Sequence, residues 1–440
     1  MERTIQVEGR ARRAGLVVLL LVLAAFLIPL PAPGEEVAGA SSSWKKIVEQ
    51  TDIAGSIRGS YWSSSRSLND QDNLGVTALW LRGRSQLLPE VALVADGWLM
   101  NDNLFSARAT NALLREGYLD LRFGPLDIRV GQQIIAWGRA DRLNPTDNLT
   151  SRNFTLLVPE DGDQRTGTTG IQATYHVGGG ISLIGVWLPT FQPNIIPIES
   201  PPDPFVLLPR QLPTDPVSQF AVKVNQTGRQ VDWSLSFFDG FDLYPDLEIV
   251  GTSLTKINVA QTYHHIQVVG ADAATVWGPY GLRAEMAYTF TEHWKNSAVK
   301  SPFFYMVLGG DRTFPGSLNV NLQFVLRVIS DYQNPINVPN PAFRAVAIEQ
   351  ATINNQLDEV QEAITLRVSK KWLNETLETE VASIVNLNRG DYAVRPKAKY
   401  AITDHLRATV GGDIFRGPTP SYFGRIRDTS TAYVELRWDY

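Results

Sequence analysis

The chain has 440 residues, of which 44% are hydrophobic and none is cysteine, and its formal net charge is -5. The lack of cysteine excludes disulfides, thiol catalysis and zinc–thiolate sites, and the mild negative charge argues against nucleic acid as a partner. A mean hydropathy slightly below zero is expected where half of each strand faces water, so any membrane signal is dispersed along the chain.

Residues 1–40 have the pattern of a secretory signal peptide. A basic start precedes an apolar run over residues 16–30, and Ala38-Gly39-Ala40 suits a signal peptidase that leaves Ser41 as the first mature residue. Prolines end the apolar run after roughly fifteen residues, short of the ~20 that a permanent membrane helix needs. We therefore expect export across the inner membrane and a short periplasmic N-terminal segment over residues 41–52.

The rest of the chain, residues 53–440, predicts one all-β domain. Period-two alternation bounded by Gly, Pro, Asn and Asp predicts strands, and most of the runs have the ~9 to 11 residues that a tilted membrane strand needs. Eighteen strands are expected near residues 53–62, 74–84, 90–100, 112–123, 126–137, 167–176, 180–189, 217–226, 230–239, 262–274, 279–291, 302–312, 317–329, 360–371, 375–386, 391–402, 405–414 and 431–440. If two weak strands were loops, the count would be sixteen.

The connections between these strands alternate in length. The even-numbered connections are short and lie at residues 85–89, 124–125, 177–179, 227–229, 275–278, 313–316, 372–374 and 403–404. The odd-numbered ones are mostly long and lie at residues 63–73, 101–111, 138–166, 190–216, 240–261, 292–301, 330–359, 387–390 and 415–430. Short periplasmic turns alternating with long extracellular loops are typical of a transmembrane antiparallel β-barrel of the bacterial outer membrane. Both chain ends then lie on the periplasmic side, and the number of strands is even.

If the apolar face of each strand points to lipid, the opposite face lines the lumen. The basic residues of that face are Arg82, Arg84, Arg122, Arg129, Lys223, Arg283, Arg327, Arg367, Lys371, Arg395, Lys397, Lys399, Arg407 and Arg437. The acidic ones are Asp120, Asp127, Asp232, Glu285, Glu378, Glu380, Asp413, Glu435 and Asp439. Because bases outnumber acids, we expect a weak preference for anions; the alternative is that the charges pair across strands and only keep the wall wet.

The segment from Arg129 to Arg165 carries the densest pattern. A strand runs into Trp137-Gly138, a turn follows at Asn144-Pro145, and about thirty residues rich in both charge signs come next. Connections of this length without regular structure are usually functional or disordered. The segment is therefore the first place to look for a site.

Arg129, Gly131, Gln133, Trp137, Gly138, Asn144 and Pro145 form the pattern Arg-x-Gly-x-Gln, Trp-Gly, Asn-Pro. This pattern resembles an uncharacterised family of proteobacterial outer-membrane porin-like barrels. It is more distantly similar to the alginate-export barrels, although Gln132 stands where those carry Arg. The resemblance, which covers only this segment, implies a porin or a transporter, in some cases for hydrophobic substrates.

We expect residues 138–166 to fold into the barrel and narrow it. In this hypothesis Arg139, Arg142, Arg152 and Arg165 face Asp141, Asp147, Glu160, Asp161 and Asp163. The residues expected at the constriction or along the pore are Arg129, Gln133, Trp137, Arg139, Asp141, Arg142, Asp147, Arg152, Asp161, Asp163, Arg165, Arg82, Arg84, Arg122, Arg327 and Arg367. The alternative is a solvated outer loop whose motif only aids assembly.

Two later connections have features of their own. Residues 189–216 contain nine prolines and predict a stiff, extended stretch. Residues 342–358 follow Pro341 without a further proline, which favours a short helix within a loop.

The final strand alternates strictly and ends on an aromatic residue. Its apolar side, which ends in Trp438 and Tyr440, suits lipid, and its polar side, with Glu435 and Arg437, suits water. It resembles the closing strand of bacterial outer-membrane barrels, which implies that Trp438 and Tyr440 form the signal for the barrel-assembly machinery and that the strand pairs with residues 53–62. A half-buried strand of a soluble sandwich alternates in the same way.

We find no pattern for catalysis, a metal or a cofactor: no nucleophile motif, phosphate-binding loop or HExxH is present, and His264 and His265 point to opposite faces of a strand.

The leading interpretation is an outer-membrane channel of a Gram-negative bacterium for small polar, preferably anionic, solutes. The alternatives are a dedicated duct for a hydrophobic compound or a polysaccharide, and a structural barrel or sheath around a partner protein. Outer-membrane lipid and lipopolysaccharide are the expected surroundings; the sequence leaves the oligomeric state open.

Overall fold

The computed structural model describes residues 51–104, 110–199, 201–214, 217–296 and 298–440. The predicted signal peptide, residues 1–40, lies outside the described residues, as does most of the expected segment 41–52.

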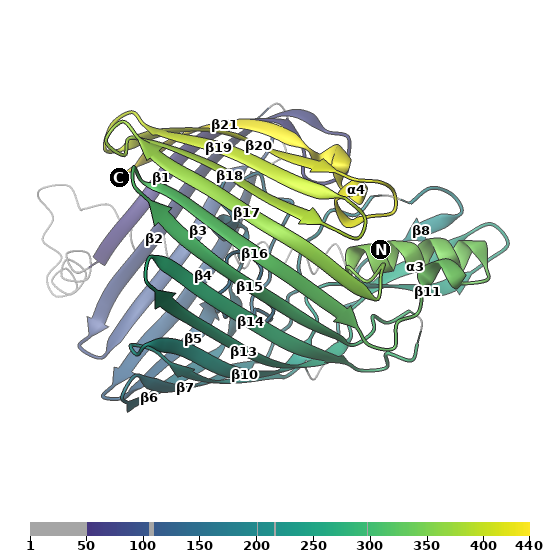
Figure 1. Cartoon of the computed structure of the whole chain (residues 1–440), viewed down its shortest axis with the longest axis horizontal. Helices are drawn as coiled ribbons and strands as arrows, with labels where there is room; N and C mark the ends of the chain where they lie inside the picture. Colours follow the sequence, from purple (N-terminus) through teal and green to yellow (C-terminus); the bar gives the residue numbers. More distant parts are fainter. Residues whose placement is uncertain (1–50, 105–109, 200, 215–216, 297) are drawn as a thin grey trace, which may run out of the picture.

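Eighteen strands form one antiparallel sheet that closes on itself (Figure 1). Each strand pairs with the one before and after it in this order, and β21 pairs with β1. The strands are β1 Thr51–Ser64, β2 Asp72–Leu88, β3 Val91–Asn101, β4 Thr110–Phe123, β5 Leu126–Gln133, β6 Thr168–Gly178, β7 Ile181–Leu188, β9 Gln219–Gln226, β10 Val231–Phe241, β13 His265–Trp277, β14 Tyr280–Thr291, β15 Phe303–Phe314, β16 Leu318–Ile329, β17 Val360–Trp372, β18 Leu377–Asn386, β19 Tyr392–Ala401, β20 Leu406–Arg416 and β21 Thr431–Asp439. The predicted all-β barrel is confirmed, with eighteen strands rather than sixteen.

The two faces of the barrel wall differ as the alternation predicts. On β21, Val434 and Leu436 are 45% and 52% exposed on the outer face, whereas Tyr433 and Glu435, which alternate with them, are buried on the inner face. Exposed Val, Leu, Ile, Phe, Trp and Tyr side chains recur around the ring. An outer surface this apolar over so wide an area suits lipid.

The barrel closes where the two ends of the strand series meet. Ser60 pairs with Glu435 in the β1–β21 ladder, and the backbone N–H of Tyr440 donates to the carbonyl of Gly55 at 3.2 Å. The ring of Tyr440 occupies the space that a Cβ at Gly55 would take. The final aromatic residue therefore lies at the closing seam.

Short turns lie at one end of the barrel and long connections at the other (Figure 1). The long connections 189–218, 242–264, 330–359 and 417–430 form what we call the cap. It contains a three-stranded sheet of β8 Phe205–Leu207, β11 Asp246–Thr252 and β12 Ile257–Thr262, the helices α3 Pro341–Ile353 and α4 Tyr422–Arg425, and the 3-10 turns η2 Pro335–Asn337 and η3 Arg427–Thr429. Leu247 and Val259 of the small sheet pack against Val346 and Ile353 of α3.

The helix predicted within residues 342–358 is present as α3. It begins at Pro341, which suits the first helical position because proline has no N–H to leave unpaired. The side chain of Asn340 caps the first turn by accepting from Ala342 N. None of the helices in the described part of the chain has the length and apolar character that a membrane span needs.

Two expectations about local structure are corrected. The fifth strand was expected to run to Trp137, but β5 ends at Gln133. The cap sheet was not expected, because β8 and β12 pair in parallel across two different connections and local alternation carries no signal for such contacts.

Candidate functional site

The connection between β5 and β6 leaves the wall immediately after Gln133. Gly131 has a φ of +133°, and a Cβ there would meet the backbone of Gly117 and Tyr118, so the strand bends where only glycine fits. Beyond it, Ile134 N donates to Glu116 Oε1 at 2.9 Å in place of a ladder bond. The segment 134–167, which we call the lumen segment, therefore turns away from the sheet.

The start of the lumen segment is anchored on an apolar patch of the inner wall. Trp137 is buried with Ile135 and Leu149 against Phe238 and Ile266 of β10 and β13. The ammonium of Lys223 lies 5.4 Å from the centre of the Trp137 ring, which adds a cation–π contact.

Glu285, on β14, holds the following turn and is 0% exposed. Its two carboxylate oxygens accept five hydrogen bonds, from Arg139 N, Ala140 N, Asn144 Nδ2, Thr146 N and Thr146 Oγ1, at 2.8 to 3.1 Å. Gly138 adopts a φ of +98°, and a Cβ there would collide with this carboxylate. The Trp-Gly and Asn-Pro elements of the motif thus wrap around one buried acid.

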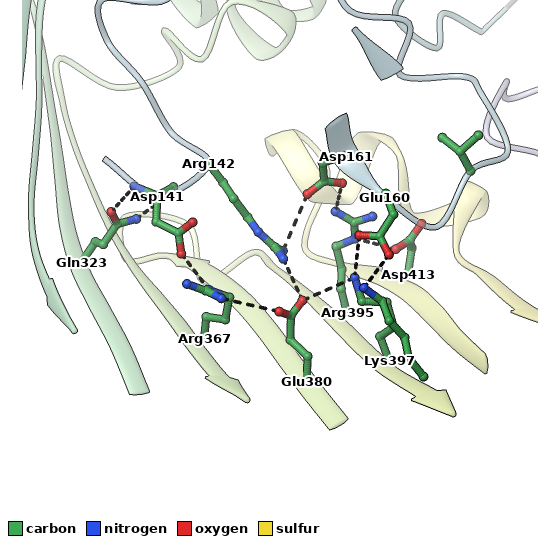
Figure 2. A network of polar contacts seen from close by, with 12 residues as sticks. Asp141, Arg142, Glu160, Asp161, Gln323, Arg367, Glu380, Arg395, Lys397 and Asp413 are labelled. Atoms are coloured by element: carbon green, nitrogen blue, oxygen red, sulfur yellow. Dashed lines mark hydrogen bonds and ion pairs between the residues drawn. The ribbon is translucent and has the colours of Figure 1, made fainter. Parts of the chain in front are cut away.

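The lumen segment then reaches the opposite wall (Figure 2). Asp141 pairs with Arg367 of β17, with Oδ2 2.8 Å from Nε, and Arg142 pairs with Glu380 of β18 at 2.7 Å. β5 is the fifth strand of the ring and β17 the fourteenth, so half of the barrel lies between them in either direction. The segment therefore crosses the lumen.

A second group of charges continues along β19 and β20. Asp161 lies 2.5 Å from Arg395 Nη1, and Glu160 lies 3.2 Å from Lys397 and 2.8 Å from Lys399. Arg395 also pairs with Asp413 at 2.6 Å. Figure 2 shows Glu160, Asp161, Arg395, Lys397 and Asp413 as one network with Arg142 and Glu380. Each cation of this network contacts at least one carboxylate.

These contacts govern the protonation of the acids in the lumen segment. Burial by itself raises the pKa of Asp161, but the charges of Arg395 and Arg142 outweigh it and lower the pKa to about 2. Burial likewise raises the pKa of Glu160, and Lys397 and Lys399 reverse the effect and hold it below its usual value. Both acids are therefore ionised at neutral pH.

The end of the segment returns past β1 to β6. Asp163 lies 2.8 Å from Arg58 of β1 and 3.8 Å from Arg115 of β4. Within the segment, Asp147 pairs with Arg165 at 2.5 Å and with Arg152 at 3.4 Å. The segment is thus tied both to the wall and to itself.

Arginines outnumber acids on the inner face of β2, β4 and β5. Arg84, Arg122 and Arg129 all pair with one carboxylate, Asp120, at 3.0, 3.0 and 3.6 Å. Arg82 faces the same side without an ion pair among the described residues. Asp127 of β5 lies opposite Arg122 as a second acid, so the four arginines exceed the two acids of this part of the wall.

A cavity of about 530 Å³ lies between the lumen segment and the cap. The lumen segment lines it with Asp141, Arg142 and Asp161, and the cap lines it with Tyr422 and Arg425. The barrel wall completes the lining with both charged and apolar side chains.

Most of the residues expected at the constriction lie in these contacts, with three differences. Gln133 is 0% exposed and donates to the carbonyl of Gly170, and Trp137 is buried as described, so neither lines an open path. Arg139 pairs with Asp272 of β13 rather than with an acid of its own segment. Arg152 and Arg165 do face Asp147, and Arg142 faces Asp161 at 3.7 Å.

Several residues of the network were not singled out from the sequence. Glu285 and Glu380 were placed on the inner face but given no role. Arg58, Arg115, Asp272 and Arg66, which pairs with Asp413, were not recognised as inward. The alternation of their strands does place Arg58 and Asp272 inside, but nothing local shows which charge of a distant strand each one meets.

The two aromatic residues expected to signal assembly lie on β21 and just after it, with both rings on the outer face and 5.4 Å between ring centres. Their part in assembly stays a prediction.

These features define a class: a closed antiparallel β-barrel with an apolar outer surface and one long connection across its lumen. Similar solved structures include OccK3 from Pseudomonas aeruginosa, at 12% identity with a TM-score of 0.54 over 90% of this chain and 96% of that one. OccAB2 from Acinetobacter baumannii is 9% identical with a TM-score of 0.55 over 90% and 99%, and OprD from Pseudomonas aeruginosa is 10% identical with a TM-score of 0.51 over 89% and 95%. No protein-family model matches the sequence, and no curated protein does. The chain therefore shares the fold of these barrels.

Proposed function

We propose that this protein is an outer-membrane channel of a Gram-negative bacterium that lets small polar solutes, preferably anions, cross the membrane. The lumen segment narrows the pathway. The outer apolar face meets lipid and lipopolysaccharide, and Trp438 and Tyr440 are read by the barrel-assembly machinery.

The observation that carries this proposal is the path of the lumen segment. It enters the lumen at β5, contacts β17, β18 and β19 on the far side, and returns to β6. A closed barrel of eighteen strands is wide enough to hold an aqueous channel, and a fixed crossing segment reduces its bore. The solved barrels OccK3 and OprD share this fold, which fits a channel.

The preference for anions rests on how the charges pair. Most wall charges near the lumen segment are neutralised by a partner, as the pairing alternative expected. In the patch around Asp120 the arginines are in excess, because Arg84, Arg122 and Arg129 share that acid and Asp127 is the one further acid opposite them. Positive charge on the wall raises the local anion concentration and lowers the barrier to anion entry.

The test is a recording of ion currents across a planar lipid bilayer that contains the full-length protein. We expect discrete conductance steps and, in a potassium chloride gradient, a reversal potential that shows modest chloride preference. The double variant Arg84→Gln and Arg122→Gln should reduce that preference. A clear cation preference in the unaltered protein would contradict the anion proposal, and the absence of steps would contradict a channel.

A dedicated duct for one bulkier substrate is the second candidate. The cavity between the lumen segment and the cap favours it, because a simple sieve needs no pocket beside its narrowest point. Block of the current by one class of solute, without block by others of equal size, would distinguish a duct from an open channel.

A further inference from the structure

Two cations, Arg312 of β15 and Lys370 of β17, lie on the outer face of the barrel. Arg312 follows Leu308 by four residues and Lys370 follows Leu366 by four, and the two leucines are exposed on that face, by 42% and 39%. Side chains an even number of residues apart share one face of a strand. Both cations are close to the short turns that end their strands, which places them at the rim of the lipid-facing surface.

The other acids, lysines and arginines that face outward from the described barrel strands lie at the opposite end of the wall. They are Asp239, Glu362 and Arg416, each near a long connection. The short-turn end of the outer face therefore carries two positive charges and no acid in its described strands.

The acids nearest to the two cations in the chain pair with other bases. Asp311 pairs with Arg283 at 2.9 Å, and Glu375 pairs with Lys371 at 2.8 Å. The two outward cations themselves form no ion pair with a carboxylate among the described residues. Their charge is therefore available to a ligand.

Aromatic rings hold both cations in place. The guanidinium carbon of Arg312 lies 4.6 Å from the ring centre of Phe314 and 5.1 Å from that of Tyr280, whose hydroxyl accepts a hydrogen bond from Nη1 at 2.9 Å. Nζ of Lys370 lies 3.8 Å from the ring centre of Trp372. An aromatic face attracts a cation but carries no net charge, so these contacts orient the two groups without neutralising them.

The two cations are close enough to act together. Val320 of β16 lies opposite Arg312, and Leu318, on the same face of the same strand, lies opposite Lys370. Neighbouring strands are about 4.8 Å apart, so β15 and β17 are roughly 10 Å apart, a gap that the long side chains of arginine and lysine can close from both sides. Leu318 and Val320 provide an apolar floor between them.

The surroundings indicate the class of ligand. Trp277, Tyr280, Trp372 and Tyr400 are exposed near the same short turns, as in the aromatic band that marks the level of lipid headgroups. Short turns lie on the periplasmic side of such barrels, where the lipid is phospholipid. A headgroup with a net negative charge complements the two cations, whereas a zwitterionic headgroup already carries its own ammonium.

We propose that Arg312 and Lys370 form a binding site for the headgroup of an anionic phospholipid of the periplasmic leaflet. The guanidinium and the ammonium hold the phosphate, and an acyl chain lies over Leu318 and Val320. The site goes beyond the proposed function, because it requires the outer-membrane position of the barrel and not the passage of solutes.

The experiment is native mass spectrometry of the full-length protein in detergent that contains equal amounts of phosphatidylglycerol and phosphatidylethanolamine with the same acyl chains. Each basic residue near an anionic headgroup contributes roughly fivefold in affinity. We therefore expect protein carrying phosphatidylglycerol to exceed protein carrying phosphatidylethanolamine at least about fivefold. Glycerol 3-phosphate, a soluble phosphate without acyl chains, is the third probe and should not compete at the same concentration.

The double variant Arg312→Gln and Lys370→Gln removes both charges and should remove most of this preference. Arg312→Lys keeps the charge and should keep most of it. The matched control is Arg416→Gln, which removes an outward-facing arginine at the opposite end of the wall and should leave the preference unchanged. Heat-modifiable gel mobility shows whether each variant is a folded barrel; if the double variant is not, Lys370→Gln alone takes its place, with an expected loss of a few-fold.

Equal binding of the two lipids, or equal loss in the double variant and in Arg416→Gln, would overturn the site. Competition by glycerol 3-phosphate at the concentration of the lipids would overturn the lipid as its ligand. Current steps in the bilayer recording without a preference for phosphatidylglycerol would refute the site and leave the channel intact, and the reverse result would refute the channel alone.

Discussion

Glu285 shows how one residue determines the path of the lumen segment. Its carboxylate is buried and accepts five hydrogen bonds from a stretch of eight residues, Arg139 to Thr146. Alternation predicts that Glu285 faces inward. It cannot predict the acceptor role, because the donors lie more than a hundred residues away in the chain and are mostly backbone N–H groups that any sequence carries.

We expect Glu285→Ala to release the start of the lumen segment while the barrel remains closed. Each buried donor that loses its acceptor costs about 1–3 kcal/mol, so several together should exceed about 3 kcal/mol. The measurement is the temperature at which the folded band in a denaturing gel shifts to the unfolded position, together with the noise of the open-channel current.

The control for Glu285→Ala is Glu378→Ala on β18, which removes an inward acid that makes no hydrogen bond or ion pair to the lumen segment. It should leave both readings near those of the unaltered protein. Glu285→Gln keeps the size of the side chain and one acceptor oxygen. Its unfolding temperature and current noise should therefore lie between those of the two alanine variants. Equal behaviour of the Glu285 and Glu378 alanine variants would mean that the buried acid does not hold the segment.

At the scale of elements, strands are predictable where they alternate and are bounded by turn residues. The structure has all eighteen barrel strands close to the expected ranges, because each must present one face to lipid and the other to water. β5 is the exception, since Gly131 and the bond from Ile134 N to Glu116 end it early. Alternation does not predict the cap sheet, because β8, β11 and β12 are short. In addition, β8 pairs with β12 although the two strands belong to different connections.

The contact between the lumen segment and β19 should persist in moderately acidic solution. Asp161 has a pKa lowered from 3.8 to about 2, so its ion pair with Arg395 stabilises the contact fully above about pH 4. The stabilisation is then lost as the pH falls from the ordinary value through the lowered one. Glu160, whose pKa is also lowered, acts in the same direction.

Single-channel conductance should therefore stay constant from neutral pH down to about pH 5 and change below about pH 4. The variant Asp161→Asn, which removes the titrating group, should show at neutral pH the change that acid produces in the unaltered protein. A transition centred near about pH 6 would come from another titrating group and would contradict the role of the Asp161 contact.

At the scale of the whole molecule, closure is the property that the sequence pattern predicts most directly. The long and short connections alternate, which requires an even number of strands with both ends on one side, and β1 pairs with β21 accordingly. The pattern cannot predict which strands on the far side of the lumen the lumen segment contacts, since these contacts depend on how far the segment reaches.

The closing seam can be tested by cysteine cross-linking, because the chain has no cysteine of its own. Ser60 and Glu435 lie directly opposite each other, at the roughly 5 Å that cross-strand partners have and that a disulfide spans. We expect the pair Ser60→Cys and Glu435→Cys to oxidise to a closed chain that migrates faster in a non-reducing denaturing gel. Ser60→Cys with Arg437→Cys is displaced by two residues and should cross-link poorly; the reverse preference would refute this register.

The central claim is that the lumen segment crosses an ion-conducting pathway and narrows it. The most direct measurement compares the single-channel conductance of the full-length protein with that of a variant lacking residues 146–162, both shown by heat-modifiable gel mobility to be folded barrels. The variant loses the contacts of Asp147, Glu160 and Asp161, and we expect it to conduct clearly more current per step, because a wider bore carries more ions. Equal conductance in the two proteins would contradict the claim.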